Sequence, residues 1–186
     1  MALTLPTFAS GSRVRASALT QITAALTSLV ATKVVKAADQ AYAASSIVLQ
    51  NDTHLLVAGL ANTLYEFELN VMYKESAGQA VDCKMAFTQP AGCTLNGPVQ
   101  GAHQNWNGTP GTNLEIEWAG FQNETNTTTS TRTFGTTTTI FGFKVSGTWQ
   151  VGATPGTLRL QAAQGTSSAA ILTIMAGSSL IIKPMP

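Results

Sequence analysis

Short runs of alternating apolar and polar residues recur from about Val34 to the end of the chain and predict an all-β domain. The clearest run is Thr63 to Tyr73, in which every second residue is aliphatic or aromatic and Glu66 and Glu68 fall between. Strict alternation gives a strand one dry and one wet face, which is typical of antiparallel sheets. Further strands are expected at residues 47–50, 54–58, 81–87, 114–118, 140–151, 157–162, 170–175 and 178–183.

Turn residues separate these runs. Many short strands with regularly spaced turns predict two packed antiparallel sheets, and we expect a jelly-roll-like β-sandwich. No helical pattern falls between the strands, which argues against a doubly wound α/β fold. Two stretches are expected to be loops: residues 96–113, rich in Gly and Pro, and residues 123–139, which are nearly all Thr, Asn and Ser. The second loop is a candidate contact surface.

The apolar residues that precede the β region follow a different spacing. Apolar residues three and four positions apart predict one short amphipathic α-helix over residues 16–32, after an extended arm. The apolar stripe consists of Leu19, Ile22, Leu26, Leu29 and Val30. An isolated helix of this length is marginal in water, so the stripe needs a partner. The pattern favours a neighbouring surface or symmetric copies over the chain's own β-domain.

These periods divide the chain into two parts. Residues 1–33 form the arm and helix, which we expect to serve attachment or oligomerisation, and residues 34–186 form the β-sandwich. Deleting residues 1–33 should therefore leave a folded β-domain that no longer assembles.

Composition narrows the classes of function. Charged residues make up 10% of the 186 residues, against roughly 25% in an average soluble protein. A surface of uncharged polar residues is common in extracellular β-proteins and virus shells, whereas cytosolic enzymes usually stay soluble through charge. The net charge of +1 gives no steering toward nucleic acid or anionic lipid. No stretch approaches the ~18–20 apolar residues of a membrane span. We therefore expect neither nucleic acid nor a membrane as a partner.

The two cysteines leave two interpretations open. Cys83 and Cys93 match no zinc or redox motif in their spacing. Two buried free thiols are the simpler interpretation, because free cysteine is among the most buried residue types. A disulfide across the intervening turn is the alternative, which geometry rather than sequence decides.

Residues able to carry catalysis are few and scattered. His54 and His103 are the two histidines, and an ordinary surface role fits each better than a base, because an active site needs several groups to converge. No metal-binding or phosphate-binding motif occurs. We therefore expect no enzymatic activity, no metal and no cofactor.

Two acidic pairs are candidates for glycosidase carboxylates. Glu66/Glu68 and Glu115/Glu117 each place two carboxylates on one strand face, and glycosidases need such a pair. Both pairs alternate with the apolar positions of their strands, so a solvated strand face explains them better.

Trp106 is a candidate contact for a glycan. It lies among Gln and Asn residues in the Gly-rich loop, and an aromatic ring among amides is suited to stacking on a sugar. The alternative is a tryptophan that packs back onto its own loop.

Several segments of the chain match sequence motifs that occur together in one group of proteins. Residues 37–58 read AADQAYAASSIVLQNDTHLLVA and residues 61–68 read ANTLYEFE; residues 82–92 read DCKMAFTQPAG and residues 151–164 read VGATPGTLRLQAAQ, with AGS at 176–178. Together they resemble small virion structural proteins of tailed bacteriophages, notably those infecting actinobacteria. The resemblance covers roughly residues 36–183 and is weakest in the two expected loops.

The resemblance implies a non-enzymatic virion structural protein: a capsid decoration or head-fibre protein, or a minor tail protein. It implies a β-domain displayed on the virion surface, often as a homotrimer, attached through its N-terminal part to major capsid or tail proteins. Such proteins are made in the host cytoplasm and bring no catalytic residues. The short N-terminal region lacks a long shaft, which favours a compact role over an extended tail fibre.

Two other functions remain open on the sequence alone. A carbohydrate- or receptor-binding module of a phage tail would use Trp106 and the Thr-rich loop on a host surface glycan. A cell-wall glycan hydrolase would need Glu115 and Glu117 to act as a convergent acid pair.

Overall fold

The computed structural model describes residues 16–27, 30–77, 82–104, 114–129, 131–134, 138 and 140–185. Within them, helix α1 (Ala16–Thr27) precedes twelve strands. The strands are β1 (Thr32–Val35), β2 (Gln40–Ala41), β3 (Gln50–Gly59), β4 (Leu64–Glu75), β5 (Cys83–Thr88), β6 (Thr94–Gln104), β7 (Leu114–Glu124), β8 (Arg132–Phe134), β9 (Phe141–Gln150), β10 (Gly156–Gln164), β11 (Leu172–Ile174) and β12 (Ser179–Pro184).

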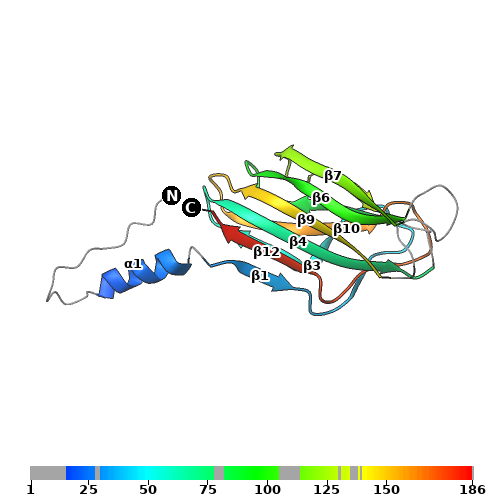
Figure 1. Ribbon diagram of the computed structural model, residues 1–186, viewed down its shortest axis with the longest axis horizontal. Coiled ribbons are helices and arrows are strands. Elements are labelled where there is room, and N and C mark those ends of the chain that lie inside the picture. The colour runs from blue at the N-terminus through cyan, green and yellow to red at the C-terminus, as the bar shows by residue number, and fades with distance from the viewer. Residues whose placement is uncertain are drawn as a thin grey trace.

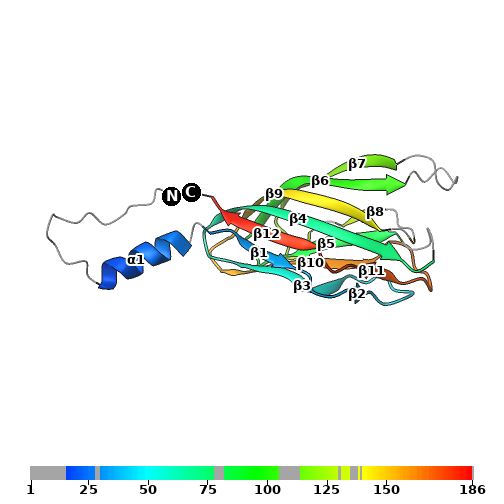
Figure 2. The same cartoon turned by 60° about the horizontal axis from the view of Figure 1, so that its bottom comes forward.

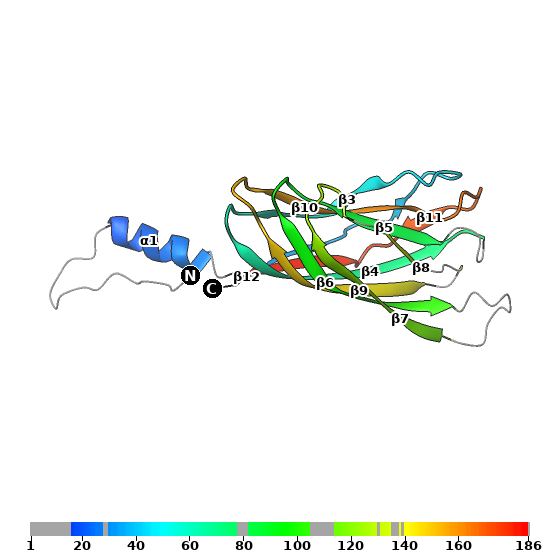
Figure 3. The ribbon, with the colours of Figure 1, turned by 90° about the horizontal axis from the view of Figure 1, so that it is seen from above.

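The described strands form two sheets that lie face to face (Figure 1). The larger sheet has eight strands, with the order β1-β12-β4-β9-β6-β7 and with β11 joining β2 to β4. The smaller sheet has the order β3-β10-β5-β8. Its strands lie above the larger sheet when the molecule is seen edge-on (Figure 3). The expected all-β antiparallel sandwich is confirmed, whereas its jelly-roll connectivity stays a prediction.

The alternation along β4 is the strongest link between sequence and core. Its alternate aromatic and aliphatic positions from Tyr65 onward are buried, and they are Tyr65, Phe67, Leu69, Val71 and Tyr73. Glu66 on the opposite face is exposed. β4 pairs with β9 along its length and with β12 and β11 on its other side, so it runs through the middle of the larger sheet.

Aromatic pairs join the two sheets across the core. Phe87 of β5 meets Phe67 of β4 and Phe121 of β7 edge-on, with ring centroids 5.9 and 5.7 Å apart. Phe134 of β8 stacks on Phe143 of β9 at 4.8 Å. Each such pair adds about 0.5–1.5 kcal/mol beyond the burial of its area, and together they fix the smaller sheet over the larger one.

The prediction of a Gly-rich loop at residues 96–113 is wrong over its first part, because β6 extends to Gln104. Glycine is needed there for close packing: a Cβ on Gly97 would lie 2.1 Å from the Ser146 carbonyl oxygen, and one on Gly147 would lie 2.0 Å from that of Asn96. The residues that suggested a loop therefore permit close approach of β6 and β9. Residues 105–113 lie outside the described residues.

The prediction of a Thr-rich loop at residues 123–139 is also partly wrong. β8 pairs with β5 inside it, and Thr129 is buried. The Thr129 amide donates to the Phe87 carbonyl, and the Thr129 hydroxyl accepts from the Phe87 amide, both at 2.9 Å. Thr129 thus extends the edge of β5 through its amide and its hydroxyl. A prediction based on low apolar content does not anticipate this pairing.

α1 is shorter than expected, because the chain has already entered the sheet at Thr32. β1 pairs with β12 from Thr32 to Val35, and this pairing outweighs the weak helical preference of Thr and Val. The β-domain therefore begins at Thr32 rather than at residue 34. α1 stands beyond one end of the sandwich and points away from it (Figure 2). None of the described helices has the length and apolar character that a membrane crossing requires.

Candidate functional site

Lys36 lies where the edge of the larger sheet is interrupted. Its amide donates to the Ser178 carbonyl at 2.8 Å, and its own carbonyl accepts from the Gly177 amide at 2.9 Å. Val34, two residues earlier, packs against the core. Because side chains alternate along a strand, Lys36 shares this inward phase. The interruption therefore directs a lysine side chain between the two sheets.

Asp52, the partner of Lys36, lies in a wide bulge of β3. Asn51 pairs with Gln161 and Leu56 pairs with Arg159, so the four residues 52–55 of β3 stand opposite Leu160 alone. Asp52 stabilises the bulge, since its Oδ1 accepts from the backbone amides of His54 and Leu55, each at 2.8 Å. The sequence suggested two strands with a turn here; the structure has one bulged strand.

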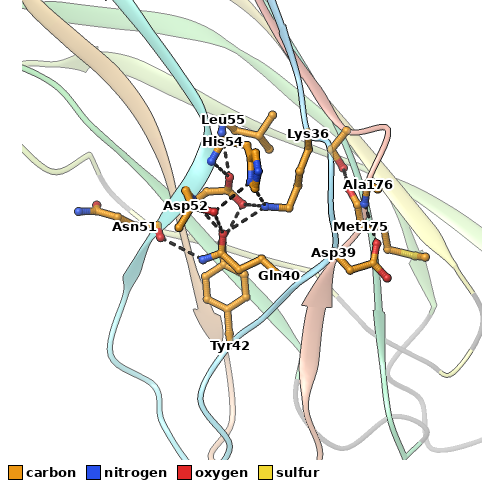
Figure 4. A network of polar contacts seen from close by, with 12 residues as sticks. Lys36, Asp39, Gln40, Tyr42, Asn51, Asp52, His54, Leu55, Met175 and Ala176 are labelled. Carbon is orange, nitrogen blue, oxygen red and sulfur yellow. Dashed lines mark hydrogen bonds and ion pairs between the residues drawn. The ribbon is translucent and has the colours of Figure 1, made fainter.

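Lys36 and Asp52 form a buried ion pair between the sheets (Figure 4). Lys36 Nζ lies 2.7 Å from Asp52 Oδ2, and both side chains are 0% exposed. The buried Tyr42 donates its hydroxyl hydrogen to the same Oδ2 at 3.0 Å. Asp52 thus accepts from four groups, two on each oxygen, which is close to the full capacity of a carboxylate.

A second set of polar groups covers the lysine side of the pair. Lys36 Nζ lies 3.1 Å from Gln40 Oε1 and 3.5 Å from His54 Nδ1. The Thr53 hydroxyl lies 2.9 Å from each of these two acceptors. With Asp52, the three hydrogens of the ammonium group have three acceptors. Thr53 is exposed and His54 is half-buried, so the network reaches from the core to the surface.

The surroundings favour the ionised form of Asp52. Burial raises its pKa, but the hydrogen bonds from Lys36, Leu55 and His54 and the charge of Lys36 outweigh burial and leave the pKa below its ordinary value. Burial, followed by the charge and hydrogen bond of Asp52, raises the pKa of Tyr42 far above its ordinary value. Tyr42 therefore stays a neutral donor throughout the physiological pH range.

This arrangement does not suit a reaction on an external substrate, because Lys36 is 1% and Asp52 0% exposed. It suits a link within the molecule: Lys36 follows β1 of the larger sheet and Asp52 lies in β3 of the smaller one. The described residues include no group of three His, Cys, Asp or Glu side chains able to hold a metal.

The alternating sequence pattern does not predict this network. Lys36 is buried in it, and His54, expected to be an ordinary surface residue, is half-buried beside the lysine. Two signals were available: a lysine in the inward phase of an edge strand, and an aspartate whose side chain can accept from amides two and three residues later.

The expected solvated face is found for the first acidic pair. Glu66 is exposed, and Glu68 forms an ion pair with Lys144 at 2.6 Å, with side chains 39% and 46% exposed. The hydrogen bond from Lys144, then that from Asn70, lowers the pKa of Glu68. These contacts are those of a solvated strand face.

The expectation of a solvated face for Glu115 and Glu117 stays a prediction. The register of β7 places these residues opposite His103 and Gly101 of β6. The side chains of Glu115, Glu117 and His103 lie outside the described part of the structure, as does Trp106.

The residues proposed for attachment are described only in part. Leu19 of α1 is 55% exposed, Val30 is 63% exposed, and Ile22 is half-buried. The side chain of Leu26 and all of Leu29 lie outside the described residues. The described residues of the apolar stripe therefore leave apolar surface exposed to water.

The two cysteines are free and buried. Burial, and then the charge of Asp82, raises the pKa of the Cys83 thiol far above its ordinary value. This agrees with the simpler of the two interpretations, two buried thiols.

Comparison with models of known protein families gives no match to this chain, and comparison with curated protein sequences gives none either.

Proposed function

We propose that this protein is a non-enzymatic structural component of a tailed-bacteriophage virion, displayed on the particle surface. The role is that of a capsid decoration or head-fibre protein, or of a minor tail protein. The N-terminal region attaches the protein to other virion proteins, and the copies assemble as a homotrimer with jelly-roll-like β-domains.

The observation that carries this proposal is the separation of α1 from the sandwich. The sandwich buries its own core, whereas α1 projects from one end with Leu19 exposed, and Val30, which follows the helix, is exposed as well. A short helix of this kind gains stability only when its apolar side is covered. Association through α1 supplies that cover, and ordering upon assembly is the expected thermodynamic signature.

The low share of charged residues, 10% of the sequence, supports the same proposal. Many copies packed on one particle must avoid both mutual repulsion and uncontrolled association. The polar residues Glu66, Glu68 and Asn70 alternate with buried positions of β4, so this part of the sheet does not present a continuous apolar surface.

Incorporation into particles tests the proposal. A phage carrying the gene with residues 1–31 deleted should yield particles without this protein, while the isolated β-domain stays folded. This deletion spares β1, which begins at Thr32. Locating the full-length chain in a density map of intact particles would separate head from tail. Normal incorporation of the truncated chain would contradict attachment through the N-terminal region.

A further inference from the structure

We propose that Lys36 and Asp52 condense into an intramolecular amide, so that the mature protein carries a covalent cross-link between β3 and the segment that follows β1. The proposal does not depend on the function proposed above. It rests on the geometry around the buried ion pair, in which the reacting groups and the groups needed to stabilise the reaction lie together.

The carbonyl side of the reaction is already provided with donors. The amides of His54 and Leu55 donate to Asp52 Oδ1 at 2.8 Å each. When an amine adds to the Asp52 carbonyl carbon, negative charge develops on this oxygen. Two fixed amides aimed at it form the arrangement that stabilises an oxyanion in acyl transfer. The bulge in β3 thus provides an oxyanion site for the side chain of its own Asp52.

The amine side is equally well placed. Lys36 Nζ lies 2.7 Å from Oδ2, and a proton transfer across this contact gives a neutral amine beside a carboxylic acid. His54 Nδ1 lies 3.5 Å from Nζ and can accept a further proton as the bond forms. The Tyr42 hydroxyl, 3.0 Å from Oδ2, donates to the oxygen that leaves.

The reaction balances without an added reagent. The nitrogen–carbon bond forms and the Cγ–Oδ2 bond breaks. Of the three ammonium hydrogens, one stays on the amide nitrogen and the equivalent of two leave with Oδ2 as water. The proton that His54 takes up passes on to Oδ2, to which Tyr42 donates a hydrogen bond, so neither side chain is consumed.

Burial supplies the driving force. Two charges in a site that is 0% exposed carry a desolvation cost. A neutral amide removes both charges, and exclusion of water from the site protects the product from hydrolysis. The link would hold the edge strand β1 to the sandwich when force acts on the N-terminal region.

Peptide mapping of the purified full-length protein tests the proposal. Trypsin cuts after lysine and arginine, and the sequence has Lys33, Lys36 and Lys74 with no other lysine or arginine between them. The amide removes the charge that trypsin recognises at Lys36. We expect one peptide spanning residues 34–74, lighter by one water molecule, with no fragment ions from breaks between residues 36 and 52.

Controls exist within the chain. Lys144 contacts Glu68 at a similar distance but in solvent, so trypsin should cut after Lys144 normally. In Asp52→Ala, cleavage after Lys36 should be restored. A water loss confined to a peptide 37–74 would indicate a cyclic imide at an Asp residue and would contradict the proposal. So would unmodified peptides 34–36 and 37–74 from the folded wild-type protein.

Discussion

The Asp52 side chain accepts hydrogen bonds from four groups at the edge of the sandwich. It holds Lys36, as an ion pair or as the proposed amide, and it accepts from Tyr42 and two backbone amides. Asp52→Ala should therefore lower the free energy of unfolding by about 3–5 kcal/mol, because it leaves a buried cation and several donors without an acceptor. Chemical denaturation followed by circular dichroism measures this loss.

The exposed pair provides the matched control for that measurement. Glu68→Ala removes a carboxylate that is 39% exposed in its pair with Lys144, so the loss should stay below about 1 kcal/mol. Equal losses in the two variants would show that burial of the Lys36–Asp52 pair adds nothing to its contribution.

The cysteines allow a second prediction at the scale of the residue. The thiolate is the form that reacts with iodoacetamide, and the raised pKa of Cys83 together with its burial keeps this form unpopulated and covered. The folded protein should resist alkylation, and raising the pH from 7 to 9 should not label Cys83 while the fold holds. Denaturation without reductant should expose two reactive thiols. No reactive thiol under denaturing conditions would indicate an oxidised pair.

At the scale of the element, β6 and β9 depend on two glycines that face each other. A Cβ on Gly147 would lie 2.0 Å from the Asn96 carbonyl oxygen and 2.6 Å from Gly97 Cα. Gly147→Ala should therefore separate the strands and destabilise the protein by about 1–3 kcal/mol, the usual range for overpacking. Thermal unfolding of this variant beside Gly142→Ala is the measurement. Gly142 has a single backbone oxygen at 3.0 Å, so the same substitution there should cost less.

The elements also show how far sequence reasoning reaches. β4 was predicted well because each of its alternate positions enters one core, so a local period carries the global answer. β6 was missed because its Gly and Pro serve a contact with β9, which local composition does not encode. The Lys36–Asp52 network was missed for a related reason: it depends on an interruption in one strand meeting a bulge in another. Such a coincidence is set by register rather than by spacing.

At the scale of the whole molecule, the sandwich and α1 meet different requirements. The sandwich closes its core with aromatic pairs between sheets and, at the edge by β1, with the Lys36–Asp52 link. The described part of α1 instead leaves Leu19 exposed beyond the end of the sandwich. Stability and association are therefore expected to respond to different residues.

Replacing both Leu19 and Ile22 by Ser tests that separation. The variant keeps the full chain and the sandwich, but it removes apolar side chains that a trimer would bury between copies of α1. Its mass in solution, measured by light scattering after size-exclusion chromatography, should fall from that of a trimer to that of a monomer. Its thermal midpoint should stay near that of the wild-type β-domain, because the sandwich buries its core without α1. A variant that remains trimeric would place the association surface on the sandwich itself, and the exposed Val35 of the edge strand β1 would then be the next position to change.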